Sequence, residues 1–275
     1  MNIGITSRAE GTDDKIRCSP VLDHLQYRVL CLLAPASPSQ CSGAAYRTQS
    51  KLDVLLGKNW RQEVKDKVVI DFGCGDGGES VEIARAGARR VIGVDIRDAL
   101  LWRARETAEL AGVNKRCHFT CDAHEQADMI ISLDSFEHFS QPEPVLAAMH
   151  DLLPANGVVL AGFGPTWYHP YGGHLFSVFP WAHLLFSEKA LIRWRSTVRN
   201  DGATRFSEVE GGLNQMTIAR FERLLAAHSF NVAYLEPVPI RRLGRFHNRL
   251  TREFLSAIVR VKLIKREATE RAGAA

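Results

Sequence analysis

VVIDFGCGDGG, residues 68–78, joins a short apolar run to a cluster of glycines, and a helical pattern follows directly. The apolar run predicts a buried strand. Glycines between a strand and a helix let the backbone approach a ligand, with the N–H groups of the helix N-terminus facing it. Gly73, Gly75 and Gly78 satisfy the GxGxxG pattern of dinucleotide-binding proteins, which by itself leaves the ligand open.

Outward from this stretch, apolar runs alternate with helical segments at the spacing of βαβ units. They are rich in Val, Ile and Leu, as parallel strands covered on both faces should be. Six such strands are predicted at 67–72, 90–95, 116–122, 128–134, 158–163 and 231–236. In residues 257–265 apolar side chains alternate with Arg260 and Lys262, which predicts a seventh strand at the sheet edge. A basic amphipathic helix at a membrane surface is the alternative there. We therefore predict an α/β fold with a doubly wound, mostly parallel seven-stranded sheet.

The parts of the chain outside the sheet pattern predict the domain organisation. Residues 1–60 form an N-terminal arm and a capping helix, because apolar residues recur at helical spacing in 21–33. Residues 61–265 form the main domain, and 266–275 form a flexible tail. Residues 164–215 are aromatic, His-rich and too long for a plain connection, so we expect an inserted substrate lid after the fifth strand.

Composition and charge limit the function classes. The formal net charge is +4, from 35 Lys and Arg against 31 Asp and Glu, and the basic excess lies in residues 241–275. The body of the protein therefore gives no support to nucleic-acid binding, and membrane contact is at most peripheral. The chain lacks a run of apolar residues long enough to span a bilayer and a secretory signal, which indicates a cytoplasmic protein with reduced cysteines. The oligomeric state stays open.

Carboxylates lie at the carboxyl ends of the first three predicted strands. Asp71 would repel a pyrophosphate but could accept hydrogen bonds from the ammonium group of an amino acid. Asp95 can accept both hydroxyls of a ribose, and Asp122, followed by Ala123, can reach an adenine amino group. Asp71 therefore favours a nucleotide that carries an amino acid over a dinucleotide.

The segments VVIDFGCGDGG, VIGVDI, TCDAHE, DMIISLDSFEHF and LLPANGVVLAGF resemble, in order, the motifs of class I S-adenosylmethionine-dependent methyltransferases. The similarity is to the UbiE-like small-molecule group, in which a Glu-His pair follows the fourth strand, and it covers roughly residues 65–265. It implies a Rossmann-like methyltransferase fold and S-adenosyl-L-methionine as the cofactor. The cofactor contacts that it implies are Asp71, Gly73, Cys74, Gly75, Gly77, Asp95, Ile96, Asp122, Ala123, Leu133 and Asp134.

The methyl acceptor needs a base if it is a hydroxyl. His138 is the preferred candidate, because histidine titrates near neutrality, and His174, His169 and Glu137 are the others. Aromatic residues of the insertion would form the apolar wall of the acceptor pocket, or else the core of a small helical subdomain. The predicted pocket residues are Trp167, Tyr168, Tyr171 and Phe176.

A metal-assisted site is an alternative that we do not expect. Asp134, Glu137, His138 and His174 resemble in outline the ExxEH…H arrangement of metal-dependent RNA 3′-terminal 2′-O-methyltransferases, with Asp at the first position instead of Glu. We predict methyl transfer to an oxygen, in preference to a nitrogen or carbon, of a natural-product, sugar or lipid-like metabolite. The alternatives are a NAD-dependent oxidoreductase and a non-catalytic partner subunit that binds S-adenosylmethionine.

Overall fold

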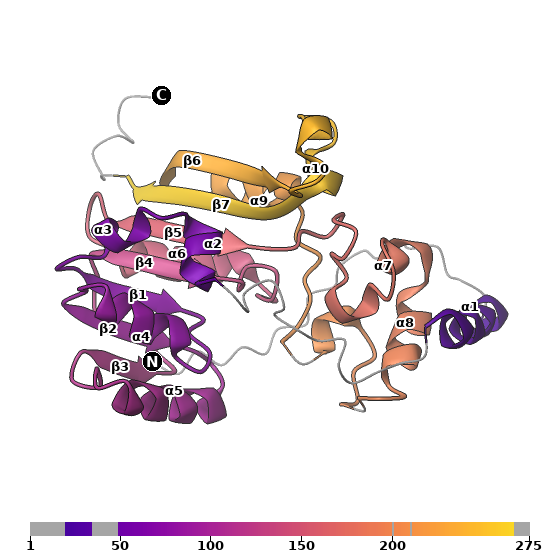
Figure 1. The fold of residues 1–275 in the computed structure, drawn as a ribbon, viewed down its shortest axis with the longest axis horizontal. Coiled ribbons are helices and arrows are strands. Elements are labelled where there is room, and N and C mark those ends of the chain that lie inside the picture. Colours follow the sequence, from indigo (N-terminus) through magenta and orange to yellow (C-terminus); the bar gives the residue numbers. More distant parts are fainter. Residues whose placement is uncertain (1–19, 35–48, 200, 210, 267–275) are drawn as a thin grey trace.

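One mixed sheet organises the computed structural model, which describes residues 20–34, 49–199, 201–209 and 211–266. The strand order is β3-β2-β1-β4-β5-β7-β6 (Figure 1). The strands are β1 (Val68–Phe72), β2 (Arg90–Val94), β3 (Cys117–Thr120), β4 (Met129–Leu133), β5 (Val158–Phe163), β6 (Phe230–Pro239) and β7 (Ser256–Lys265). The first five are parallel, and β7 runs antiparallel to both β5 and β6. The predicted doubly wound, mostly parallel seven-stranded sheet is confirmed.

The position predicted for the last strand is wrong. β7 lies between β5 and β6, so β6 forms the edge. Its apolar side chains are fully buried on one face of the sheet: Val259, Val261 and Leu263. On the other face the Lys262 ammonium donates to the Glu63 carboxylate at 2.6 Å. Apolar and basic residues therefore alternate in β7 because one face of this interior strand packs in the core and the other forms an ion pair. The alternative prediction of a basic amphipathic helix for these residues is wrong as well.

Helices cover both faces of the sheet. One face carries α2 (Lys51–Leu56), α3 (Trp60–Glu63), α4 (Gly78–Arg85) and α5 (Asp98–Leu110), and the other carries α6 (Pro142–Asp151) and α9 (Ile218–Ala226). A 3-10 turn, η5 (Gly244–Phe246), and α10 (Arg252–Leu255) connect β6 to β7. With apolar clusters on both faces, β4 is buried along its whole length, as expected of a central parallel strand.

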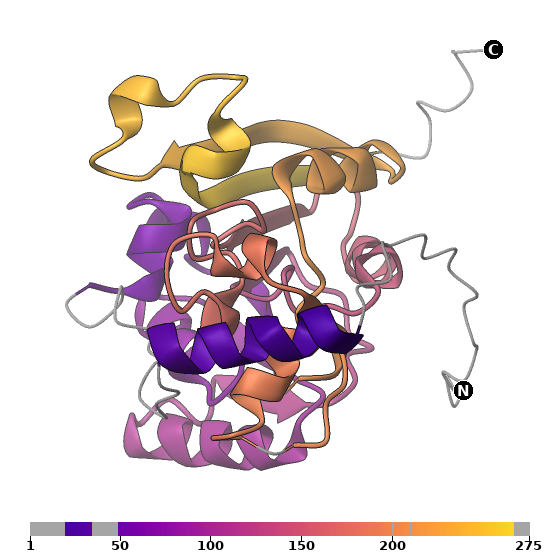
Figure 2. The ribbon, with the colours of Figure 1, turned by 90° about the vertical axis from the view of Figure 1, so that its right-hand side faces the viewer.

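A helical lobe stands beyond the carboxyl ends of the parallel strands, on the right of Figure 1. It consists of α1 (Pro20–Leu33) and the described residues between 164 and 215, with η3 (His174–Phe176), α7 (Ala182–Leu185), α8 (Glu188–Arg195) and η4 (Phe206–Glu208). The predicted helix at 21–33 is confirmed as α1. It packs on α8 and not on the sheet (Figure 2), and the Trp194 indole donates to the Ala34 carbonyl at 2.8 Å.

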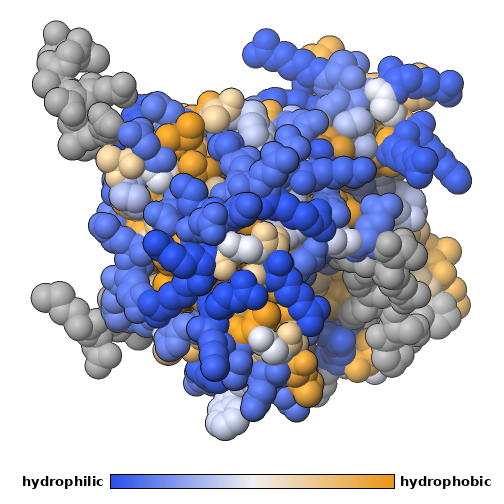
Figure 3. All heavy atoms as spheres, turned by 60° about the vertical axis from the view of Figure 1, so that its left-hand side comes forward, coloured by the Kyte–Doolittle hydropathy of each residue, from blue (hydrophilic) through white to orange (hydrophobic). Residues whose placement is uncertain are grey.

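The lobe has its own apolar core, centred on Leu30, Phe176, Leu191 and Trp194. The molecular face in Figure 3 is largely hydrophilic, with apolar residues in small groups. None of the helices in the described ranges has the length and apolarity of a bilayer-spanning segment. Of the predicted N-terminal region, residues 1–19 and 35–48 lie outside the described residues, and so do residues 267–275 of the predicted tail.

Candidate functional site

The candidate site lies where the strand order changes direction. β1 pairs with β2 on one side and with β4 on the other, so the helices that follow β1 and β4 leave toward opposite faces. In open α/β sheets, ligands bind at this switch point, outside the carboxyl ends of the strands. The glycine loop follows β1 and Asp134 follows β4, so the predicted cofactor residues meet at this edge.

The glycine loop turns through three positive φ angles, +87° at Gly73, +54° at Gly75 and +82° at Gly77. A Cβ added at Gly73 would lie 2.4 Å from the Ser135 hydroxyl, and one at Gly77 would lie 2.8 Å from the Ala104 Cβ. A Cβ at Gly75 would meet no atom within 4 Å. Gly73 and Gly77 are therefore required by close packing against neighbouring residues. Gly75 is the position where the loop is open to a ligand.

Cys74, one of two non-glycine residues inside this loop, faces inward. Its side chain is 2% exposed, and burial raises the pKa of its thiol, which stays neutral. The amides of Gly73 and Cys74 donate to the Val94 carbonyl at 2.8 and 3.0 Å, which holds the loop against β2. Any contact of Cys74 with a cofactor therefore falls to its backbone.

Asp71 is buried below the loop, at 2% exposure, and accepts a hydrogen bond from the Ser80 hydroxyl at 2.5 Å. Burial raises the pKa of Asp71 to about 7, against the lowering effect of Ser80, and the charge of Glu79 raises it further. A cationic ligand would favour the ionised form. Its predicted role as the ammonium acceptor stays a prediction.

Asp95 links the loop to the end of β2. Its carboxylate accepts from the Gly75 amide at 3.0 Å, from the Arg97 amide at 3.0 Å and from the Arg97 guanidinium at 2.9 Å. Burial alone would raise the pKa of Asp95, but the hydrogen bonds from Arg97 and Gly75 outweigh it and lower the pKa. Asp95 is therefore ionised. Sequence reasoning did not identify Arg97, whose signal is a basic residue two positions after the acid.

The residues predicted to surround adenine lie at the open end of this edge. Ile96 is 89% exposed. The Asp122 side chain is 67% exposed, with one oxygen 3.1 Å from His124, and Ala123 is half-buried. The structure leaves these three residues accessible, and their contacts with adenine stay predictions.

The end of β4 brings in a lysine that sequence reasoning missed. Leu133 is buried, and Asp134 adopts a positive φ of 46°. The Lys51 ammonium lies 3.5 Å from the Asp134 carboxylate and 3.9 Å from that of Glu79. Burial alone would lower the pKa of Lys51, but the charges of Asp134 and Glu79 raise it, so the side chain is cationic. No local pattern connects α2 with β4, because the contact exists only in the folded protein.

Three of the predicted acid-base residues converge. Glu137, His138 and His174 each place one ligand atom within 4.8 Å of the others, although His174 comes from the lobe and the other two follow β4. His138 Nδ1 lies 2.8 Å from the Gly212 carbonyl, and His174 Nδ1 lies 3.2 Å from the Gly172 carbonyl. Since a carbonyl only accepts, both Nδ1 atoms carry a hydrogen, which leaves Nε2 as the ring nitrogen that can bind a proton or a ligand.

The protonation states of the cluster follow from burial. Burial, followed by the neighbouring His138, lowers the pKa of His174 to about 4, so its ring is neutral. Glu137 is 2% exposed, and burial, followed by the charge of Asp134, raises its pKa well above the usual value. Its Oε1 accepts from the Gly164 amide at 3.3 Å, whereas Oε2 has no hydrogen-bond partner among the described residues. Asp134, the fourth residue of the metal alternative, pairs with Lys51 instead.

His169 does not join the cluster. Its Nδ1 accepts from the Tyr171 amide at 3.0 Å, and burial lowers its pKa to about 4. A buried histidine that sequence reasoning missed, His183, bonds to the Ser177 hydroxyl at 2.9 Å and the Trp167 carbonyl at 2.6 Å. Because both ring nitrogens of His183 have hydrogen-bond partners within the lobe, we assign this residue a structural role there.

The structure excludes one of the four residues predicted for the aromatic pocket. Phe176 is 1% exposed and packs on Phe206 with ring centroids 4.6 Å apart, so it belongs to the lobe core and cannot line an acceptor pocket. Trp167 is half-buried, and Tyr168 and Tyr171 are 36% and 50% exposed. Their contact with an acceptor stays a prediction.

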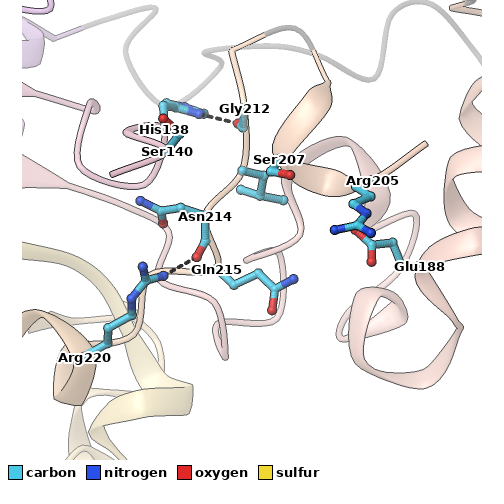
Figure 4. Close-up of a pocket in the computed structure, with 10 residues that line it drawn as sticks. His138, Ser140, Glu188, Arg205, Ser207, Gly212, Asn214, Gln215 and Arg220 are labelled. Carbon is cyan, nitrogen blue, oxygen red and sulfur yellow. Dashed lines mark hydrogen bonds between the residues drawn. The ribbon is translucent and has the colours of Figure 1, made fainter. Parts of the chain in front are cut away.

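A cavity of about 250 Å³ opens beside His138 (Figure 4). It is polar, and its wall consists of His138, Ser140, Glu188, Arg205, Ser207, Gly212, Leu213, Asn214, Gln215 and Arg220. None of the four aromatic residues predicted for the pocket lines it. The guanidinium groups lie far from the Glu-His pair in the sequence, so no local pattern pointed to them.

The family model and the curated relatives match only part of the chain. Residues 69–157 match the family model described as a methyltransferase domain. Over 117 residues the chain is 28% identical to the ribosomal protein L11 methyltransferase of Serratia proteamaculans, covering 42% of this chain and 40% of that protein. It is 36% identical over 95 residues to the ubiquinone biosynthesis O-methyltransferase of Ruegeria pomeroyi, covering 33% of this chain and 38% of the relative. The chain thus spans about two fifths of the length of these curated relatives.

Solved structures share the fold. The cyclase SpnF has a TM-score of 0.51 at 14% identity, covering 76% of this chain and 79% of that one. A protein described as a sarcosine dimethylglycine methyltransferase from Galdieria sulphuraria has a TM-score of 0.51 at 12% identity, covering 76% and 84%. At these identities the likeness establishes the fold alone. The matched residues 69–157 include the glycine loop, Asp95 and the Glu-His pair, but not the lobe.

Proposed function

Since residues 69–157 form a methyltransferase domain of the class I, S-adenosylmethionine-dependent type, we propose that the chain transfers a methyl group from S-adenosylmethionine to an oxygen of a small-molecule acceptor. One observation carries the proposal. The open position at Gly75 and the cluster of Glu137, His138 and His174 lie at the same edge of the sheet. A donor site and a group that can activate an acceptor are thereby brought together.

The donor site fits the cofactor. The backbone at Gly75 is open to a ligand, because an added Cβ would meet no atom within 4 Å. Ribose hydroxyls would replace the Arg97 guanidinium on the ionised Asp95 carboxylate. Buried Asp71 supplies a second carboxylate on the β1 side of the crevice. When bound, S-adenosylmethionine provides a methyl group activated on a positively charged sulfur.

The acceptor side favours oxygen. A hydroxyl must lose its proton as its oxygen bonds to the methyl carbon and the carbon–sulfur bond breaks toward sulfur. The cluster offers two imidazole nitrogens with free lone pairs and one unpartnered carboxylate oxygen among the described residues. A neutral amine needs no such activation before attack, because its nitrogen already carries a lone pair.

A small acceptor fits the position of the lobe. The lobe lies beyond the carboxyl edge of the sheet (Figure 1). His174, which belongs to the lobe, reaches the cluster with Glu137 and His138. We therefore assign the described residues between 164 and 215, together with α1, to a lid over the acceptor. One relative is named for a protein substrate and another for ubiquinone biosynthesis, so the test must include both substrate classes.

The test uses S-adenosylmethionine with a deuterated methyl group. The full chain is incubated with pooled hydroxylated metabolites, and in parallel with ribosomal proteins, and the products are examined by mass spectrometry. We expect label in a metabolite and none in protein. Label found only in protein would refute the small-molecule acceptor. Calorimetry that detects no binding of S-adenosylmethionine or S-adenosylhomocysteine would refute the whole proposal.

A further inference from the structure

Three side chains from two parts of the molecule direct metal-binding atoms toward one point. We propose that Glu137, His138 and His174 bind a divalent first-row transition metal such as Zn²⁺, which holds and activates the acceptor hydroxyl. The cation site stands on the geometry of these residues. Only the identity of the bound hydroxyl rests on the proposed methyl transfer.

The two imidazoles are arranged as metal ligands usually are. A ligating histidine donates its other ring N–H to a carbonyl or carboxylate, which fixes the tautomer and the ring orientation. His138 and His174 each do so, through Nδ1 to the carbonyls of Gly212 and Gly172. Their ring centroids are 5.3 Å apart, and the Nε2 atoms remain as ligands.

The carboxylate supplies an independent indication of a cation. Glu137 is 2% exposed, and its Oε2 has no hydrogen-bond partner among the described residues. A buried polar atom without a partner is costly, and buried charges are paired or coordinate metals. The lysine in this region, Lys51, already pairs with Asp134 and Glu79. A bound cation would compensate Glu137.

The donor set and spacing suit a catalytic ion. Two histidines and one carboxylate leave a coordination position open for water or substrate, as in catalytic zinc sites. The three ligand atoms lie within 4.8 Å of one another, and a tetrahedral ion with bonds of about 2.1 Å requires about 3.4 Å between ligands. Closure by at most about 1.4 Å, through rotation of side-chain torsions, completes the site.

The ion would change the acceptor chemistry. An acceptor hydroxyl replaces metal-bound water, and the cation lowers its pKa so that its proton leaves to solvent. The oxygen then bonds to the methyl carbon while the electron pair of the carbon–sulfur bond goes to sulfur, which becomes neutral. Because His174 belongs to the lobe, the ion would also fasten the lid to the sheet edge.

The test measures metal binding without cofactor or acceptor. Tag-free full-length protein is dialysed against EDTA and then titrated with ZnCl₂ in a calorimeter. Co²⁺ replaces Zn²⁺ in a second titration, followed by its visible absorption. We expect one equivalent per chain and d–d bands typical of low-coordinate Co²⁺. Glu137→Gln and His174→Ala should each weaken Zn²⁺ binding by more than the about 10- to 100-fold that loss of a residue hydrogen-bonded to a ligand costs. His169→Ala, which removes a lobe histidine outside the cluster, should not weaken it.

Each outcome decides the proposal. Wild-type protein that binds neither ion stoichiometrically overturns it, as do variants Glu137→Gln and His174→Ala that bind Zn²⁺ as tightly as wild type. A thermal unfolding scan of each variant separates loss of the site from loss of the fold. Binding of S-adenosylhomocysteine in the same preparations separates failure of the metal site from failure of the methyltransferase assignment.

Discussion

Replacing Gly75 by alanine tests whether the open glycine loop is the surface that contacts the donor. Gly112 offers a matched control, because it has a similar φ of +69° against +54°, and an added Cβ meets no atom within 4 Å at either position. Gly112 lies between α5 and β3, at the amino edge of the parallel sheet and away from the site. The two substitutions therefore share their backbone cost and differ in location.

The similar backbone conformations of Gly75 and Gly112 allow the expected losses of stability and of affinity to be estimated separately. A left-handed conformation costs an alanine about 1–2 kcal/mol, so each variant should unfold about 2–8 °C below wild type. At Gly75 the new methyl group also occupies space that the ligand needs, and overpacking of this kind costs about 1–3 kcal/mol. Since 1.4 kcal/mol is tenfold, affinity for S-adenosylhomocysteine should fall about 5- to 150-fold for Gly75→Ala and remain unchanged for Gly112→Ala.

Calorimetric titration of both variants with S-adenosylhomocysteine, together with scanning calorimetry, provides the readout. Equal affinity of the two variants would refute the assignment of Gly75 as the contact point. Weakened binding by both would show that the loss comes from general destabilisation. Gly75→Val should abolish binding, because a branched side chain fills the same space further.

Three further predictions concern charge and packing. Asp71 has a pKa raised to about 7 by burial, so its carboxylate forms as the pH rises through that value, and calorimetric affinity for S-adenosylhomocysteine should rise with it; Asp71→Asn should bind weakly with a flat profile, and a pH-dependent variant would contradict this role. Arg195→Met should cost about 2 kcal/mol in urea unfolding, since the buried guanidinium makes charged hydrogen bonds of 2.8 and 2.7 Å to the partly exposed Asp201; unchanged stability would show that the pair contributes nothing. Phe221→Ala should cost about 3–5 kcal/mol, because its ring is fully buried and 4.8 Å from that of Phe163, and a loss below 1 kcal/mol on the same denaturation curve would mean that the site collapses without a cavity.

The sheet was predictable because parallel strands covered on both faces are apolar along nearly their whole length, and the runs at β1, β4 and β5 show this pattern. Strand order was not predictable at the last strand. An alternating pattern does not distinguish an edge strand from an interior strand whose polar face is tied down by an ion pair, as Lys262 is to Glu63. The position of α1 on α8 likewise depends on contacts between distant segments.

The sequence predicted which residue types form the candidate site better than it predicted how they are arranged. Carboxylates at strand ends and the Glu-His pair have local signals, and the structure brings Glu137 and His138 to the predicted edge. No local sequence signal predicts the carbonyl partners of the imidazoles or the pairing of Lys51 with Asp134. These contacts arise only when the lobe and α2 fold onto the sheet. Phe176 was wrongly predicted to line the acceptor pocket, because the sequence does not distinguish an aromatic residue that faces a pocket from one buried in the core of the lobe.

The interior place of β7 has a consequence for folding during synthesis. β7 leaves the ribosome after β6, yet it fills the slot between β5 and β6. Until residues 256–265 emerge, the nascent chain presents the unpaired backbone of β5, an apolar strand, to its surroundings. Exposed strand edges invite pairing with other chains, so a chaperone that shields nascent polypeptides should matter most for this protein in the short interval before β7 is released.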